Sequence, residues 1–328
     1  MHAIVKNKLL VVTYLLTLLY ALHYGIPLYA TSSYLHQYFG SSTVSLLYML
    51  GSIAALIGSM SVAKYMRRFH TYGFTIGLVI LEIIATISFG LTQIPFLLVL
   101  FFIVHFLLQT LLYVALNVFI ESFSKHAETG SIRGLFLMLL NVGILMSPLI
   151  GGMILSVASF SALYVVASAV LIPFVFLVHT YLSHIEEPAY ERINMLGAFR
   201  LAWKDRNIRA ALIAEFVVQC FYAVMIIYTP LYLGTIGIPL TVYMTFIMPL
   251  VLIPLVALPY ELGFLADRKY GEKELLIVGL LILATTVFAC VIIDSPNVSL
   301  WTAVLLISRI GAACVETMAF TYYFKKVG

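Results

Sequence analysis

Charge is scarce in this sequence of 328 residues, because Asp, Glu, Lys and Arg together make up only 10% of it. A typical soluble domain contains about 25% charged and about 45–50% apolar residues. Here hydrophobic residues reach 63%. A soluble fold cannot bury such an excess, since its surface shrinks too slowly as the chain grows. The composition excludes an ordinary soluble protein and indicates that lipid covers the surplus apolar surface.

Other features that carry chemistry are also missing from the sequence. There is no nucleotide-binding loop, no H-E-x-x-H and no G-x-S-x-G motif, so we expect no enzyme and no bound cofactor. ATP-driven transport would need a separate subunit. The cysteines lie in apolar runs without a Cys or His at metal spacing, and we predict small core residues and no metal site. They are Cys220, Cys290 and Cys314.

Long apolar runs dominate what is present. A helix that crosses about 30 Å of hydrocarbon needs about 20 apolar residues, and ten runs are long enough. They are continuous rather than alternating, which favours helices over barrel strands. The first follows Lys6 and Lys8 without a cleavage site, so we expect a retained span. The ten runs are 9–31, 43–63, 73–92, 96–120, 134–157, 160–182, 208–233, 238–262, 275–293 and 300–324.

The basic residues predict the orientation of these spans. Every Lys and Arg except Arg309 lies at the N-terminus or in every second connection. Cytoplasmic loops carry the excess of Lys and Arg in membrane proteins. This alternation supports ten spans and predicts a multi-pass protein of the cell membrane (inner or plasma membrane) with a cytoplasmic N-terminus. It also explains the net charge of +4 without nucleic acid.

A polar, mixed-charge segment interrupts the pattern after six spans. We expect a six-helix bundle over residues 1–183, a cytoplasmic linker over 184–207 and a second bundle over 208–328. The linker holds either a short amphipathic helix at 196–203 or a plain solvated loop. Pro-Leu-Tyr recurs at 27–29 and 230–232, and Val62-Ala63 matches Leu265-Ala266 at the same offset. Two matches in one register indicate a duplicated six-helix unit.

Two motifs resemble signatures of the major facilitator superfamily. The connection 263–273 resembles its cytoplasmic loop signature through Gly263, Asp267, Arg268 and Gly271, with one extra residue before Gly271. The corresponding first-half loop, 61–68, lacks the Asp. The fifth span resembles the motif of the family's drug–proton antiporters, with Ser147 in place of one Gly. That motif comprises Gly143, Ser147, Pro148, Gly151 and Gly152.

The resemblance implies two pseudo-symmetric helical bundles with twelve spans, so we expect the second bundle to be incomplete here, with four helices present. It also implies a central cavity lined by the first, fourth, seventh and tenth helices. Buried polar residues are costly in a membrane and usually face a cavity. In this sequence they concentrate in those four spans. The candidate substrate and proton pathway is His105, Gln109, Tyr113, Glu215, Gln219, Arg309 and Glu316.

Each of these residues also has a structural interpretation. Arg309 and Glu316 can form an ion-pair network, and His105 can be a hydrogen-bonded structural histidine. Glu82 lies alone in the third span, and the pattern assigns it no role.

The sequence predicts a secondary transporter that moves a small organic solute by alternating access. The expected coupling ion is H⁺, and drug or multidrug efflux is one form of this activity. Arg309 would anchor an anionic or polar group, and Glu316 or Glu215 would exchange protons. The expected partners are the solute, the ion and the lipid bilayer, and we expect a monomer. Two alternatives stay open: an intramembrane enzyme, for which no catalytic pair stands out, and a non-transporting scaffold or receptor of the same fold.

Overall fold

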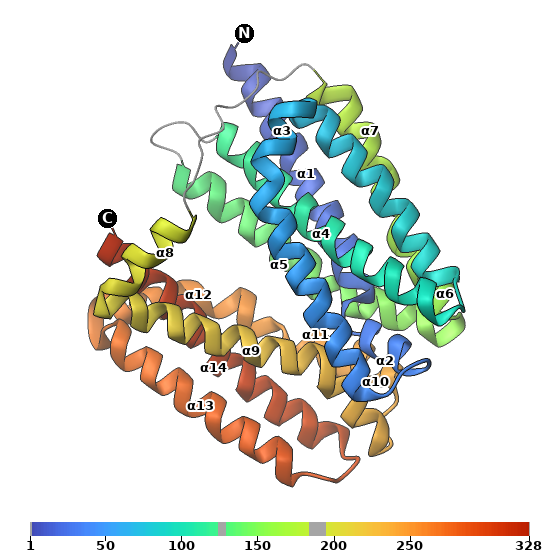
Figure 1. The fold of residues 1–328 in the computed structure, drawn as a ribbon. Helices are drawn as coiled ribbons and strands as arrows, with labels where there is room; N and C mark the ends of the chain where they lie inside the picture. Colours follow the sequence, from blue (N-terminus) through green and yellow to red (C-terminus); the bar gives the residue numbers. More distant parts are fainter. Residues whose placement is uncertain (1, 124–128, 184–194, 328) are drawn as a thin grey trace. The chain divides into compact units, whose positions relative to one another are not determined.

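The computed structural model describes residues 2–123, 129–183 and 195–327, and every regular element in these ranges is helical (Figure 1). The chain forms two compact units, Met1–Arg192 and Ile193–Gly328. The predicted all-α membrane fold is confirmed.

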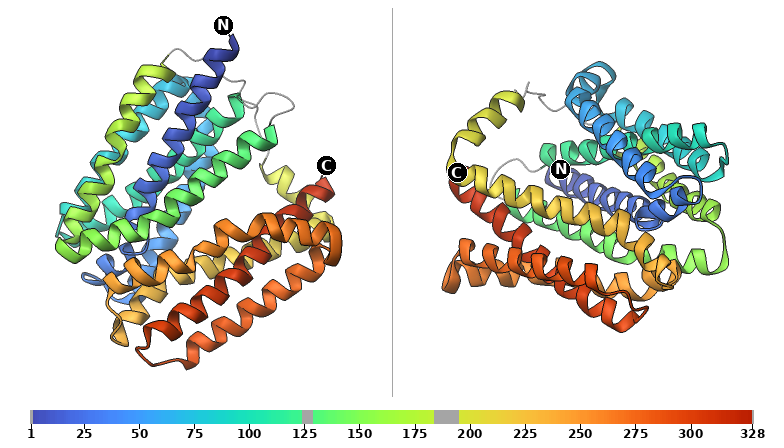
Figure 2. Two further views of the ribbon diagram at one scale, coloured as in Figure 1. Left: turned by 180° about the vertical axis from the view of Figure 1, so that it is seen from behind. Right: turned by 60° about the horizontal axis from the view of Figure 1, so that its bottom comes forward.

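The helices of the N-terminal unit follow the apolar runs of the sequence. They are α1 His2–Leu28, α2 Thr31–His36, α3 Ser41–Leu91, α4 Pro95–Phe123, α5 Thr129–Val157, α6 Phe160–Ala169 and α7 Leu171–Leu182. The C-terminal unit contains α8 Met195–Lys204, α9 Arg206–Thr235, α10 Leu240–Val242, η1 Tyr243–Ile247, α11 Met248–Val251, α12 Ile253–Leu265, η2 Ala266–Tyr270, α13 Glu272–Ile292 and α14 Val298–Val327. In both views of Figure 2, α13 and α14 run side by side, and they pack against each other.

Nine apolar helices in the described ranges are long enough to cross a membrane, whereas the sequence predicts ten spans. The difference lies in α3, which has 51 residues. At 1.5 Å per residue it would be about 76 Å long, more than twice the thickness of the hydrocarbon core. Its backbone is not helical at His70 (φ 60°, ψ 155°), and Figure 1 shows α3 turning back on itself. The element therefore supplies two spans, as the sequence predicts.

The loop that resembles the family signature ends in a π-helical turn. Element η2 covers Ala266–Tyr270, and the backbone N–H of Gly271 donates to the carbonyl of Ala266 over 3.1 Å. This i→i+5 bond closes a turn one residue wider than an α-helical turn. The turn thereby accommodates the extra residue that separates Arg268 from Gly271. Gly271 then ends the element at φ 80° and ψ 158°, a region that only glycine adopts without strain.

The linker after the first unit contains α8, so the predicted short helix at 196–203 is present. Helix α9 begins directly afterwards, because Asp205 caps its N-terminus. One carboxylate oxygen of Asp205 accepts from the backbone N–H groups of Asn207 (2.7 Å) and Ile208 (3.1 Å). These two donors have no partner within the helix, and the cap satisfies them.

The fifth-span motif forms a close contact between α1 and α5. A Cβ placed on Gly143 would overlap Ala21, and one on Gly25 would overlap Ser147. The hydroxyl of Ser147 donates to the carbonyl of Gly143 over 2.6 Å, within the helix that also contains Pro148. Gly151 and Gly152 are buried in the same helix. The small residues therefore allow two membrane helices to approach each other closely.

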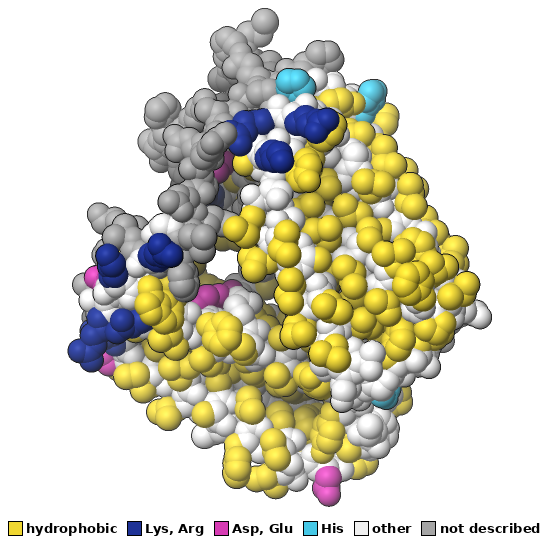
Figure 3. All heavy atoms as spheres, in the orientation of Figure 1, with side chains coloured by type: hydrophobic (Ala, Val, Ile, Leu, Met, Phe, Trp, Pro, Cys, Tyr) yellow, Lys and Arg dark blue, Asp and Glu magenta, His cyan; other side chains and the backbone are white. Residues whose placement is uncertain are grey.

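The outer surface of the bundles is apolar. Figure 3 shows hydrophobic side chains over most of the flank of the N-terminal unit, with Lys and Arg gathered where the two segments of α3 meet. Phe176 is 66% exposed, Phe288 67% and Val291 78%. Contiguous exposed apolar surface of this kind needs a non-aqueous partner, and spans of this length indicate that the partner is lipid.

Candidate functional site

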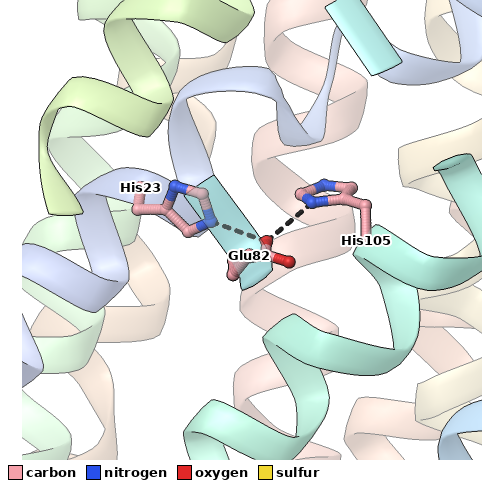
Figure 4. A group of neighbouring side chains, drawn as sticks. All are labelled: His23, Glu82 and His105. Carbon is pink, nitrogen blue, oxygen red and sulfur yellow. Dashed lines mark hydrogen bonds and ion pairs between the residues drawn. The ribbon is translucent and has the colours of Figure 1, made fainter. Parts of the chain in front are cut away.

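Three ionisable side chains meet inside the N-terminal unit (Figure 4). His23 comes from α1, Glu82 from the second segment of α3 and His105 from α4. Oxygen Oε1 of Glu82 lies 2.9 Å from Nε2 of His23 and 2.7 Å from Nδ1 of His105. His23 and Glu82 have no exposed surface, and His105 is 4% exposed. Packing of three membrane helices thus encloses a carboxylate between two imidazole rings.

Neighbouring groups fix the orientation of both rings. Nδ1 of His23 lies 2.9 Å from the carbonyl oxygen of Ala167, which can only accept, so this nitrogen carries a hydrogen. The hydroxyl of Thr86 donates to Oε1 of Glu82 over 3.3 Å and lies 3.1 Å from Nδ1 of His105. Since that hydroxyl gives its hydrogen to Glu82, it accepts from His105, whose Nδ1 therefore carries a hydrogen. In the described residues, Oε2 of Glu82 has no hydrogen-bond partner.

A small cavity of about 40 Å³ lies beside this cluster, within the N-terminal unit. Polar side chains from α1, α2, α3 and α4 line it, together with apolar ones. A water molecule needs about 10–15 Å³ of such volume, so the cavity has room for about three. The hydroxyl of Tyr48 is buried without a hydrogen-bond partner in the described part of the chain. The polar residues that line the cavity are Tyr24, Thr31, Tyr48, His105 and Gln109.

The other two predicted residues of α4 lie along the same helix. Gln109 is buried and lines the cavity, and its backbone carbonyl accepts from the hydroxyl of Tyr20 over 3.1 Å. Tyr113 is half-buried and stacks against Tyr20 with ring centroids 5.9 Å apart. Tyr20 therefore ties α1 to both positions of α4.

Arg309 of α14 is buried in the C-terminal unit, with only 2% of its surface exposed. Its guanidinium carbon lies 5.4 Å from the ring centre of Phe221 and 5.1 Å from that of Tyr222, both on α9. Nε of Arg309 has no hydrogen-bond partner among the described residues, and none of their carboxylates lies within 4.0 Å of the guanidinium. The side chain is a buried cation supported by aromatic faces.

Tyr222 connects this cation to Glu316. The two charged residues lie two turns apart on α14, about 10.5 Å along the axis, which is too far for direct contact. The hydroxyl of Tyr222 donates to Oε2 of Glu316 over 2.6 Å, while its ring faces Arg309. Glu316 is exposed. A tyrosine of the neighbouring helix thus bridges the pair.

The two remaining predicted residues, Glu215 and Gln219, pair with each other on α9. Nε2 of Gln219 donates to Oε1 of Glu215 over 2.7 Å. Glu215 is half-buried and Gln219 is exposed. The seven predicted pathway residues fall into one group in each unit. Their convergence on one central space stays a prediction.

The residues of the predicted cytoplasmic loop motif make contacts within their own connection. The guanidinium carbon of Arg268 lies 4.4 Å from the ring centre of Phe264, one helical turn before it. Gly263 is in α12, and a Cβ placed on it would meet nothing within 4 Å. The side chain of Asp267 lies outside the described residues.

Sequence reasoning missed the centre of the N-terminal cluster. It did not include His23 in the candidate pathway and gave no account of Glu82. A lone carboxylate in an otherwise apolar span was itself a signal, because such a group must find a partner. Histidines in two other spans could be its partners. However, the spacing of residues along one helix does not show which neighbouring helix packs against Glu82.

The helical architecture and its apolar spans define a polytopic membrane protein. The family model of the Major Facilitator Superfamily matches residues 5–328, and the chain belongs to that family. No curated protein sequence matches it significantly.

Solved structures of transporters share the fold. A bacterial homologue of the human lysosomal transporter Spinster, inward-facing and occupied, superposes with a TM-score of 0.72 at 17% identity, over 96% of this chain and 74% of that one. The nucleoside transporter NupG superposes with a TM-score of 0.71 at 13% identity, over 98% of this chain and 82% of that one. A D-xylose–proton symporter superposes with a TM-score of 0.65 at 16% identity, over 96% of this chain and 87% of that one.

Proposed function

We propose that this chain moves a small polar or anionic organic solute across the cell membrane by alternating access, coupled to protons. Membership of the family and the transporter fold support secondary transport. The expected domains, 1–183 and 208–328, would be the two moving bundles, with a cytoplasmic N-terminus and a monomeric chain. The likeness of the fifth span to drug–proton antiporters makes efflux the direction to test first.

The observation that carries the proposal is the state of Arg309. A buried charge without a carboxylate in direct contact is costly, and in a membrane span such a residue marks a substrate or ion pathway. Phe221 and Tyr222 stabilise the guanidinium through their ring faces, by about 0.5–2 kcal/mol. They leave its hydrogen-bonding edge for a partner. A carboxylate, phosphate or hydroxyl-rich solute can supply that partner, and a guanidinium binds carboxylate or phosphate with two parallel hydrogen bonds.

Glu316 is the proton-exchanging group that we propose for this unit, and Glu215 is the second candidate. Tyr222 touches both Arg309 and Glu316, so solute bound at the guanidinium and a proton bound at the carboxylate would influence each other through one side chain. Glu215 is paired with Gln219, a neutral partner. Gradient-driven accumulation should therefore depend more on Glu316 than on Glu215.

The test is solute-driven proton flux in proteoliposomes that contain a pH-sensitive dye. Uridine, D-xylose and benzoate serve as probes for a nucleoside, a sugar and an organic anion. We expect at least one probe to move protons with the wild type and none with Arg309→Met. Arg206→Met is the control, since that arginine is exposed at the start of α9, the helix that also carries Phe221 and Tyr222. Equal flux in Arg309→Met and wild type would contradict the role of Arg309.

Proton coupling has its own test in Glu316→Gln and Glu215→Gln. Loss of a proton carrier abolishes accumulation against a gradient but spares solute exchange at equal pH. We expect this pattern for Glu316→Gln. If both variants keep full pH-dependent accumulation, neither carboxylate couples transport to protons.

A further inference from the structure

We propose that His23, Glu82 and His105 form a proton-binding site within the N-terminal unit, which holds one proton shared by His23 and Glu82 and takes up a second proton on His105. The site lies outside the arginine site of the C-terminal unit. Its contribution to coupling rests on the proposed transport function, whereas proton binding itself does not.

The first proton follows from counting hydrogens. Nδ1 of His23 uses its hydrogen on the carbonyl of Ala167. The contact of 2.9 Å between Nε2 of His23 and Oε1 of Glu82 needs another hydrogen, either on the nitrogen or on the oxygen. Both arrangements contain the same number of protons and have no net charge, once the neutral His105 is included. The pair therefore stores one proton whichever atom holds it.

The second proton has a free position on His105. Its Nδ1 donates to Glu82 and Thr86, which leaves Nε2 with a lone pair. No partner for Nε2 is found among the described residues. His105 also lines the water-sized cavity. A hydronium ion there can transfer its proton to the Nε2 lone pair and leave a water molecule, and Glu82 then lies between two imidazolium rings with Oε2 still able to accept.

The surrounding groups do not compete for this proton. Apart from the three residues, the titratable side chains packed around the cluster in the described ranges are tyrosines from α1, α2, α3 and α6. The hydroxyl of Tyr20 donates to the carbonyl of Gln109, that of Tyr34 to the carbonyl of Phe89 and that of Tyr164 to the hydroxyl of Thr31. Tyr24 and Tyr48 line the cavity, where water can meet their hydroxyls.

The geometry favours a proton over a metal ion. The candidate ligand atoms of the three residues all lie within 4.8 Å of one another, as a metal site requires. However, Oε1 of Glu82 lies 2.7 Å and 2.9 Å from the two nitrogens. Ligand atoms around a tetrahedral zinc ion, at about 2.0–2.1 Å from it, are about 3.3 Å apart. The observed separations are those of hydrogen bonds, and the oxygen occupies the space between the nitrogens.

The cavity in this structure is too small for a sugar, a nucleoside or an aromatic acid, but it has room for about three water molecules and so for a hydronium ion. We therefore assign the cluster to the ionic side of transport. Binding or release of the second proton would change the net charge at the junction of α1, α3 and α4.

The experiment is nitrogen-15 NMR of the full chain, labelled at histidine and reconstituted in nanodiscs, because imidazole nitrogen shifts report tautomer and charge. Between about pH 8 and pH 5, where histidines change charge, we expect His105 to pass from the Nδ1–H tautomer to imidazolium. His23 keeps its hydrogen on Nδ1 throughout. Glu82→Gln, which removes the compensating charge, should abolish proton uptake by His105 in this range.

Three controls test whether the NMR signal and its titration belong to the proposed site. His179→Gln removes a histidine bonded to Tyr72 on another face of the unit and should leave the His105 titration unchanged. His105→Gln should delete that titration and identifies its signal. One equivalent of zinc chloride at pH 7 should leave the signals of His23 and His105 in place.

Three results overturn the proposal. The first is a His105 that stays neutral throughout the range in the wild type, a result that does not depend on any variant folding. The second is a His105 that titrates equally in Glu82→Gln. The third is a stoichiometric shift of both histidine signals on adding zinc, which identifies a metal site. None of these measurements involves solute movement, so they leave the transport proposal to its own test.

Discussion

Nε2 of His23 lies 2.9 Å from Oε1 of Glu82, and neither side chain has any exposed surface. The two residues are 59 positions apart and lie on different membrane helices. Their contact, with that of His105, joins α1, α3 and α4 by polar bonds inside the N-terminal unit.

Glu82→Ala should destabilise the protein strongly. It removes the shared acceptor and leaves His23 with a buried nitrogen that has lost its partner, which costs about 3–5 kcal/mol for a broken buried pair. Glu82→Gln keeps the shape and offers both a donor and an acceptor, so its cost should be less than half of that. Thermal unfolding in detergent, followed by circular dichroism, measures both. Equal stability of Glu82→Ala and wild type would show that the cluster does not hold the helices together.

Gly143→Ala should weaken the contact between α1 and α5. The new methyl group would overlap Ala21, and overpacking of this kind costs about 1–3 kcal/mol. Gly134→Ala on the same helix is the matched control, because its Cβ meets nothing within 4 Å. There the gain in helix propensity, up to about 1 kcal/mol, should leave stability unchanged or raised. The prediction fails if the two variants unfold at the same temperature.

Two substitutions separate the function of the Tyr222 hydroxyl from that of its ring. Tyr222→Phe removes the hydroxyl that donates to Glu316 but keeps the ring beside Arg309. It should impair proton coupling while solute affinity stays unchanged. Tyr222→Leu also removes the ring, and the loss of about 0.5–2 kcal/mol of cation–π energy should weaken solute binding roughly two- to thirtyfold. Binding and flux measured on the same proteoliposomes distinguish the two.

Tyr260→Leu is the control for both Tyr222 variants, because that tyrosine is 80% exposed and packs against little of the protein. It should retain binding and flux. Weaker solute binding in Tyr222→Phe than in Tyr222→Leu would contradict the assignment of the ring to Arg309.

His70→Gly should stabilise the turn between the two segments of α3. A side chain at φ 60° and ψ 155° is strained by about 1–3 kcal/mol, and glycine removes that strain. The greater freedom of glycine in the unfolded chain offsets up to about 1 kcal/mol of the gain. We expect a rise in unfolding temperature, while His70→Ala, which keeps the strain, should give none. A lower unfolding temperature for His70→Gly would contradict it.

The spans and the family could be predicted from the sequence because both depend on local patterns. Runs of apolar residues identify helices, and Gly143, Ser147 and Pro148 belong to one turn or neighbouring turns of one helix. The partners of Glu82 could not be predicted in the same way. They depend on which helices pack together and on how each is rotated, and these are properties of the tertiary structure. The bridge between Arg309 and Glu316 could not be predicted for the same reason, because Tyr222 lies on another helix.

His70 and Gly271 occupy almost the same backbone conformation, φ 60° and ψ 155° against φ 80° and ψ 158°. Each lies in the connection after the second helix of its half, close to the repeat offset that relates the Pro-Leu-Tyr sequences. The predicted duplication of a six-helix unit would give both halves the same turn. Glycine adopts this conformation without strain in the second half, whereas histidine adopts it at a cost in the first half.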